Sequence, residues 1–175
     1  MTTVFQLVAK KNLSDYFIKQ DEKVLFETER DRFIRPRFLY LKGDNAELYL
    51  ADIKFGFGKI LYQIKRVGTE EQIGTILFKT LFSNHVYVSI NQKEYHFNGG
   101  GRRNLILHMM ASGILGMFLI KKKKILYPLL INGQQVGLVR TSYLNKIFEI
   151  EDEHFQGLSE IEKQALLVGA SFAGF

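Results

Sequence analysis

The final stretch of the chain constrains its fold more than any other feature. Residues 165–173 (ALLVGASFA) contain no charged side chain and lack the polar face of a surface helix. Ser159 and Glu162 form a capping-box pattern, which predicts that a helix begins near residue 159. The apolar part, residues 165–175, is much shorter than the roughly 20 residues that span a bilayer. We therefore predict a helix over residues 159–173, enclosed by the protein's own sheet.

Alternating apolar and polar residues predict strands in the rest of the chain. The alternation is clearest over residues 60–65, 85–90 and 146–151. Turn signals lie between such segments, at residues 43–45, 67–69 and 91–93 and at the hairpin dipeptide Asn132-Gly133. Only two prolines are present, so few positions interrupt a strand ladder. Short strands joined by tight turns predict an antiparallel meander.

An internal repeat supports the meander. Residues 72–76 (QIGTI) match residues 135–139 (QVGLV), and the two glycines lie 63 positions apart. A strand and a polar turn precede each copy, and another strand follows about a dozen residues later. Residues 16–27 have the pattern of a degenerate third copy.

The chain resembles the tubby C-terminal-like superfamily, which includes LURP-one-related proteins and phospholipid scramblases. The resemblance lies in repeated units of a strand, a turn, the pattern Val/Ile-Gly-x-Ile/Val and a second strand, followed by an apolar C-terminal helix. The matching residues are 72–76 with 86–90, 135–139 with 147–151, and 159–175. The resemblance implies one mainly β domain over residues 1–175, a closed antiparallel β-barrel of about twelve strands with the hydrophobic helix through its centre. It also implies phosphoinositide or membrane binding. Residues 99–124 have no counterpart in the pattern.

Composition narrows the chemistry and the setting. The chain has no cysteine, which excludes disulfides, thiolate metal sites and cysteine nucleophiles and favours a reducing compartment. Residues 1–11 do not have the pattern of a signal peptide, so we expect a cytoplasmic protein, at most peripheral to a membrane. The net charge of +6 favours anionic partners.

The basic residues occur in clusters at positions 10–11, 30–37, 65–66, 102–103 and 121–124. Four consecutive lysines beside an apolar segment are typical of contact with acidic lipid. Glycines 99–101 before Arg102 and Arg103 match a phosphate-binding nest, but no P-loop pattern surrounds them and a flexible connection between Phe97 and Leu105 is the favoured explanation. The candidate lipid or anion site is therefore Arg102, Arg103, Lys121, Lys122, Lys123 and Lys124. The alternative is a solvated loop that keeps an apolar region soluble.

Residues 105–120 are uncharged and allow three interpretations. The segment is short for a membrane span, is flanked by basic residues on both sides, and would place the two repeat copies on opposite sides of a membrane. The membrane span is thus one interpretation. The second is an interfacial or re-entrant patch at a membrane, and the third is a buried strand or core helix.

No catalytic or metal-binding motif is recognisable. His85, His96, His108 and His154 are widely spaced in the sequence and occur in no ligand motif. The acidic residues 151–153 lack the alternating pattern of a calcium loop and predict a polar turn instead. No serine lies in a nucleophile elbow. We expect no cofactor and no metal.

These patterns favour a non-catalytic binding module that contacts anionic phospholipid or a membrane surface. We expect a monomer and do not expect a nucleic-acid partner. Two alternatives remain open. One is a lipocalin-like small-ligand carrier or enzyme, which needs a cavity in the place assigned to the helix. The other is a small membrane-anchored protein with a span at residues 105–120.

Overall fold

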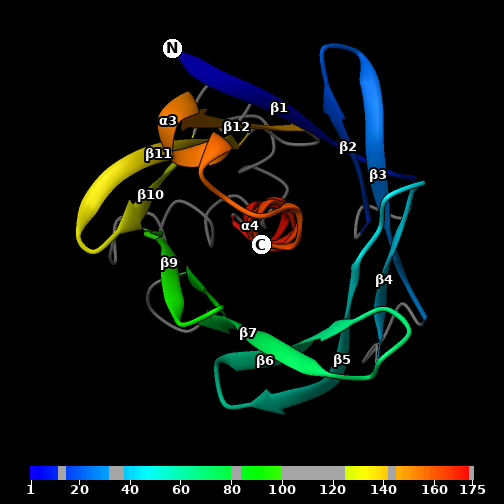
Figure 1. Cartoon of the computed structure of the whole chain (residues 1–175). Coiled ribbons are helices and arrows are strands. Elements are labelled where there is room, and N and C mark those ends of the chain that lie inside the picture. Colours follow the sequence, from blue (N-terminus) through cyan, green and yellow to red (C-terminus); the bar gives the residue numbers. More distant parts are fainter. Residues whose placement is uncertain (12–14, 32–37, 80–83, 100–124, 142–144, 174–175) are drawn as a thin grey trace, which may run out of the picture.

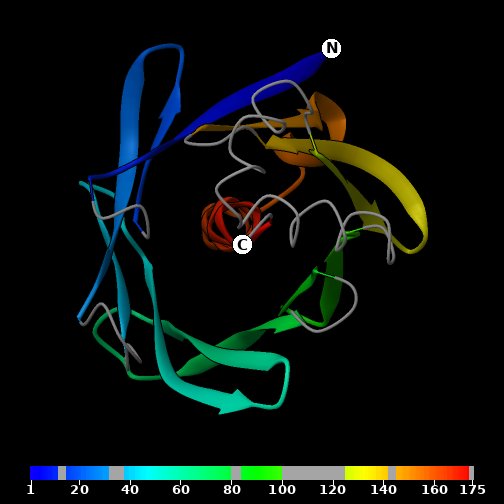
Figure 2. The same cartoon turned by 180° about the vertical axis from the view of Figure 1, so that it is seen from behind.

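Twelve antiparallel strands surround a single helix in the computed structural model (Figure 1). The structure describes residues 1–11, 15–31, 38–79, 84–99, 125–141 and 145–173. Each strand pairs with its neighbours in the sequence, and β1 (Thr2–Ala9) pairs with β12 (Asn145–Glu151) to close the barrel. The helix α4 (Glu160–Phe172) stands at the centre of the ring in both views (Figure 1, Figure 2). The predicted closed barrel with a central C-terminal helix is confirmed.

The strands are mostly short, as the turn spacing predicts, and the predicted segments 60–65, 85–90 and 146–151 fall in β6, β8 and β12. Their bounds are β1 Thr2–Ala9, β2 Tyr16–Gln20, β3 Lys23–Arg30, β4 Leu39–Lys42, β5 Leu48–Gly56, β6 Lys59–Arg66, β7 Gln72–Lys79, β8 His85–Ile90, β9 Lys93–Phe97, β10 Ile125–Ile131, β11 Gln134–Thr141 and β12 Asn145–Glu151.

The two copies of the internal repeat occupy equivalent positions in the barrel. Gly74 of β7 pairs with Ile90 of β8, and Gly137 of β11 pairs with Ile150 of β12. A Cβ at position 74 would lie 2.2 Å from the Ser89 carbonyl oxygen, and one at position 137 would lie 2.6 Å from the Glu149 carbonyl oxygen. Both repeat copies therefore contain glycine where the neighbouring strand leaves no room for a side chain.

Helix α4, Glu160–Phe172, lies within one residue at each end of the predicted range 159–173, and Ser159 and Ala173 are its caps. The Ser159 hydroxyl accepts a hydrogen bond from the Glu162 amide, and the Glu162 carboxylate accepts one from the Ser159 amide, which forms the predicted capping box. The polar turn expected at residues 151–153 is wrong in detail. A five-residue helix, α3, Asp152–Gln156, forms there because two acidic residues in its first turn favour a helix N-terminus and Phe155 is buried.

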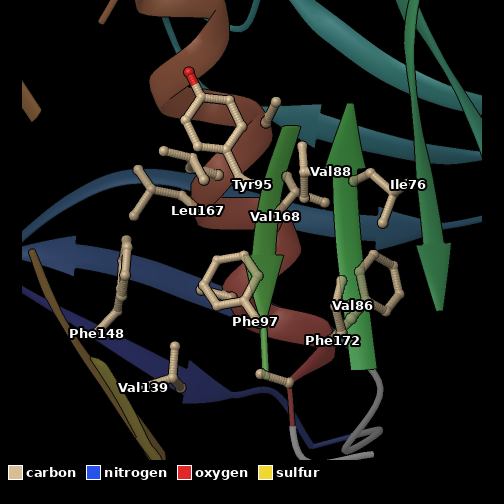
Figure 3. Close-up of a cluster of buried hydrophobic side chains, with 14 of the residues drawn as sticks. Ile76, Val86, Val88, Tyr95, Phe97, Val139, Phe148, Leu167, Val168 and Phe172 are labelled. Carbon is tan, nitrogen blue, oxygen red and sulfur yellow. The ribbon is translucent and has the colours of Figure 1, made fainter. Parts of the chain in front are cut away.

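The core forms where α4 packs against the inner face of the barrel (Figure 3). The ring of Phe172 lies 4.8 Å from that of Tyr62, measured between centroids. On the same face of the helix, three residues earlier, Gly169 approaches Val88 of β8 and Phe97 of β9. Leu166, Leu167 and Val168 are all at most 2% exposed. Enclosure on every side explains why no position on this helix after Lys163 is charged.

The two rims of the barrel are distinguished by the direction of α4. We call the rim at which α4 begins the upper rim. There Gln164 accepts a hydrogen bond from the Glu47 amide at the start of β5, and Glu162 pairs with Lys93 at the start of β9. We call the rim at which α4 ends the lower rim. There Lys146, near the start of β12, contacts Ser171 of α4.

Candidate functional site

The six basic residues predicted to bind lipid or anion, Arg102, Arg103 and Lys121 to Lys124, lie outside the described residues. So do residues 105–120. The strands on either side of this segment are described. The end of β9 at Phe97 and the start of β10 at Ile125 both lie at the lower rim. The predicted basic residues therefore belong to a connection at the lower rim, and the described residues of this rim are the candidate site.

Charged residues are unevenly divided between the two rims. In the turns, strand ends and helices of the upper rim, acidic residues outnumber lysines and arginines. They are Asp21, Glu22, Asp44, Glu47, Glu70, Glu71, Glu94, Glu151, Asp152, Glu153, Glu160 and Glu162. The cluster at Lys65 and Arg66, which belongs to the predicted basic clusters, also lies here and is separated from the others.

The lower rim has the opposite character. Its described carboxylates are Asp15, Glu29 and Asp31, whereas its described basic residues are Lys10, Lys11, Arg30, Lys54, Lys59, Lys79, Arg140 and Lys146. The segments that connect strands at this rim but lie outside the described residues contain nine lysines and arginines and no acidic residue in their sequence. Four of the five predicted basic clusters therefore belong to strand ends or connections at one rim, a grouping that only the topology reveals.

The hairpin between β5 and β6 adds two exposed aromatic side chains to this rim. Phe57 is 91% exposed and Phe55 is 51% exposed. The turn is made by Phe57 and Gly58, and Gly58 has a φ of 64°. Lys54 and Lys59 flank the two phenylalanines and are exposed. In the described part of the chain, no carboxylate pairs with either lysine, so both charges face solvent.

Just inside the lower rim, a lysine is buried at the end of the helix. Lys146 is 4% exposed, and its ammonium donates a hydrogen bond to the backbone carbonyl of Ser171. The Nζ atom also lies 4.8 Å from the centre of the Tyr16 ring. Burial, with a smaller effect of Arg30, lowers the pKa of Lys146 well below 10.5. Since the last turn of α4 contains no basic residue, Lys146 supplies from the barrel wall a hydrogen-bond donor for a carbonyl at the helix C-terminus.

A second cation lies close to the same helix end. Arg30 is 3.8 Å from Asp15, measured from Nε to Oδ1, and its guanidinium carbon lies 5.7 Å from the centre of the Phe172 ring. Beside it, the Tyr16 amide donates to the Thr28 hydroxyl over 2.8 Å. Burial raises the pKa of Tyr16 to about 12, against the opposing effect of Arg30. Arg30 thus lies beside the last residue of α4 and next to the buried residue Asp15.

Two histidines that are separated in the sequence meet on adjacent strands. The His96 Nε2 and His85 Nδ1 atoms are 2.9 Å apart, and the Gly99 amide donates to His85 Nδ1 over 3.3 Å. The Tyr87 ring stacks on His96 at 4.3 Å, and Lys79 Nζ lies 4.6 Å from the Tyr87 ring centre. Burial and the nearby Lys79 lower the pKa of both histidines. Sequence spacing missed this pair because strand register brings the histidines together.

The pair is best explained as a hydrogen bond. The ammonium of Lys79 opposes a metal cation here, and no group of three or more His, Asp or Glu side chains is placed to hold a metal ion among the residues that the structure describes. At the acidic run, Glu151 pairs with His154 over 3.4 Å and Asp152 accepts a hydrogen bond from Thr3 over 2.6 Å. These acidic side chains therefore have structural partners.

Helix α4 occupies the position where a lipocalin-like barrel holds its ligand. A small-ligand carrier or enzyme of that type needs a cavity in this place, whereas the described side chains of α4 are buried there among residues of the barrel wall. None of the helices in the described ranges is both long and apolar enough to cross a membrane. No protein-family model matches the chain, and no curated protein matches it by sequence.

Proposed function

We propose that the protein is a non-catalytic binding module that docks on anionic phospholipid surfaces with its lower rim. The observation that carries the proposal is the division of charge between the rims. Acidic residues outnumber basic ones at the upper rim, whereas the lower rim has exposed cations at Lys11, Lys54 and Lys59. A molecule with this distribution is oriented by a negatively charged surface, because one rim is attracted to it and the other is repelled.

The tubby-like resemblance supports the same proposal. A closed barrel around a hydrophobic C-terminal helix is what that resemblance implies, and proteins of that superfamily are associated with phosphoinositides or membranes. We propose that the chain is a distant relative of this group. Arg102, Arg103 and Lys121 to Lys124 remain predicted contacts.

Co-sedimentation with vesicles tests the proposal. Vesicles of phosphatidylcholine with phosphatidylserine should bind the protein at low salt, whereas phosphatidylcholine alone should not. Binding should weaken as salt is raised, because salt screens exposed charges. Each lysine near an acidic surface contributes about 1 kcal/mol, so Lys54→Gln with Lys59→Gln should weaken binding by about 30-fold.

The matched control is Lys23→Gln with Arg66→Gln, which removes two exposed charges from the upper rim and should leave binding unchanged. Neutral replacement of Lys121 to Lys124 should also weaken binding, with little loss of stability. Equal binding by all these variants, or no preference for the anionic vesicles, would refute the proposal.

A further inference from the structure

We infer that the hairpin between β5 and β6 is an insertion element whose two exposed phenylalanines enter the interfacial layer of an anionic bilayer. This inference rests on the proposed function and adds to it. The proposed function requires only electrostatic attraction to the surface. Insertion requires that apolar side chains leave water, which is a separate physical step with its own signature.

The hairpin exposes two large aromatic side chains to water. A phenylalanine with 91% of its surface in water, such as Phe57, gains nothing from the fold of the described chain. Phe55, two residues earlier, is half exposed and lies opposite Ile60 on the paired strand. Two large aromatic side chains thus face water within one short hairpin. Their transfer into an apolar layer would be favourable, because it removes apolar surface from water.

The two lysines that flank the phenylalanines indicate which kind of surface the hairpin binds. Lys54 and Lys59 lie on either side of the phenylalanines, and the hairpin contains no acidic residue between them. Aromatic side chains bordered by lysines match the boundary between acyl chains and acidic headgroups, where the rings reach the apolar layer and the ammonium groups stay with the phosphates. An apolar protein groove would satisfy the rings without requiring either charge. We therefore commit to an anionic bilayer as the occupant.

The position of the hairpin agrees with this orientation. Gly56 and Lys59 form a pair beside the turn. Strand β5 ends at Gly56 and β6 begins at Lys59, both at the lower rim, where Lys11 also lies. When this rim faces a membrane, the hairpin faces it as well.

Tryptophan fluorescence tests insertion directly, because the chain contains no tryptophan. In Phe57→Trp the single tryptophan reports on the hairpin. Its emission should shift to shorter wavelength when phosphatidylserine-containing vesicles are added, and brominated acyl chains should quench it. The control is Val67→Trp, at a 52% exposed position of the upper rim, and its emission should not change. Phe57→Ser should reduce partitioning about tenfold, which corresponds to about 1.4 kcal/mol.

The outcomes separate the two proposals. If Phe57→Trp sediments with anionic vesicles but its emission stays unchanged, insertion is refuted and electrostatic docking stands. If neither tryptophan variant nor the wild type binds anionic vesicles, the proposed function fails and insertion fails with it. If Phe57→Ser instead converts a dimer to a monomer in sedimentation without lipid, the hairpin is an interface between copies and insertion is overturned.

Discussion

Replacing Lys146 by methionine should change how the stability of the barrel depends on pH. The lysine is 4% exposed, and burial lowers its pKa well below 10.5. Methionine keeps an unbranched side chain of similar length, so it preserves the packing beside Tyr16 while it removes the ionisable amine. The backbone carbonyl of Ser171 then loses its donor, at a cost of roughly 1 to 3 kcal/mol.

The sign of the effect follows from the direction of the pKa shift. In the unfolded chain the lysine keeps its proton up to about pH 10.5, whereas in the barrel it loses the proton at a lower pH. Between these two values the unfolded state binds more protons, so the free energy of unfolding rises with pH. One such group contributes at most about 1.4 kcal/mol per pH unit. The methionine variant lacks this contribution, and its stability should rise less steeply.

Urea unfolding at several pH values from 7 to 9.5 measures the difference. The upper limit avoids the titration of tyrosines. Burial raises the pKa values of Tyr16, Tyr95 and Tyr127 to about 12, so these residues lower the stability as the pH rises above 10. Lys23→Met, at an exposed position of β3, is the control and should follow the wild type. If the Lys146→Met and wild-type curves run parallel over this range, the lysine keeps its proton in the folded barrel and the reasoning fails.

Two further substitutions test how tightly the barrel encloses α4. Leu167→Asp should abolish soluble expression, because it places an unpaired charge at a site that is 2% exposed, whereas Leu126→Asp at a 47% exposed site should express normally. A soluble, monomeric Leu167→Asp protein would show that the helix is peripheral. Gly169→Ala should lower the stability by about 1 kcal/mol, since overpacking costs about 1 to 3 kcal/mol and the gain in helix propensity returns about 1. The new Cβ would lie 2.5 Å from Val88 Cγ2, so Val88→Ala should relieve the loss, and additive destabilisation in chemical unfolding would contradict this packing.

The fold could be predicted from the sequence because its strongest signals are local and agree with one another. A capping box before an all-apolar segment predicts a helix that has to be buried in a protein dissolved in water. The meander predicts the sheet that encloses it, so the two signals agree. The repeat identified Gly74 and Gly137, which occupy equivalent positions beside Ile90 and Ile150. Helix α3 was missed because five residues are too few to show helical periodicity.

The candidate site was less predictable because it depends on which strand ends share a rim. Lys11 and Lys59 lie far apart in the sequence, and only the alternation of strand direction places them at the same rim. The meeting of His85 and His96 likewise depends on the register of β8 and β9. For the hairpin, a local signal existed. The alternation of lysine, phenylalanine and glycine over residues 54–59 combines apolar rings with a tight turn, which is unusual for an exposed loop.

The charged residues nearest the two ends of α4 have a structural role, whereas the exposed lysines of the lower rim do not. Helix α4 directs its positive N-terminus to the acidic upper rim and its negative C-terminus to the basic lower rim. At the lower end, Lys146 donates a hydrogen bond to the Ser171 carbonyl. At the upper end, Glu162 caps the helix and pairs with Lys93, and the helix dipole also favours Glu160 and Glu162. The effect fades within one helical turn, so it does not explain the exposed charges of Lys54 and Lys59. Because these two lysines and the phenylalanines between them stabilise nothing inside the barrel, they are the residues whose presence a membrane surface would explain.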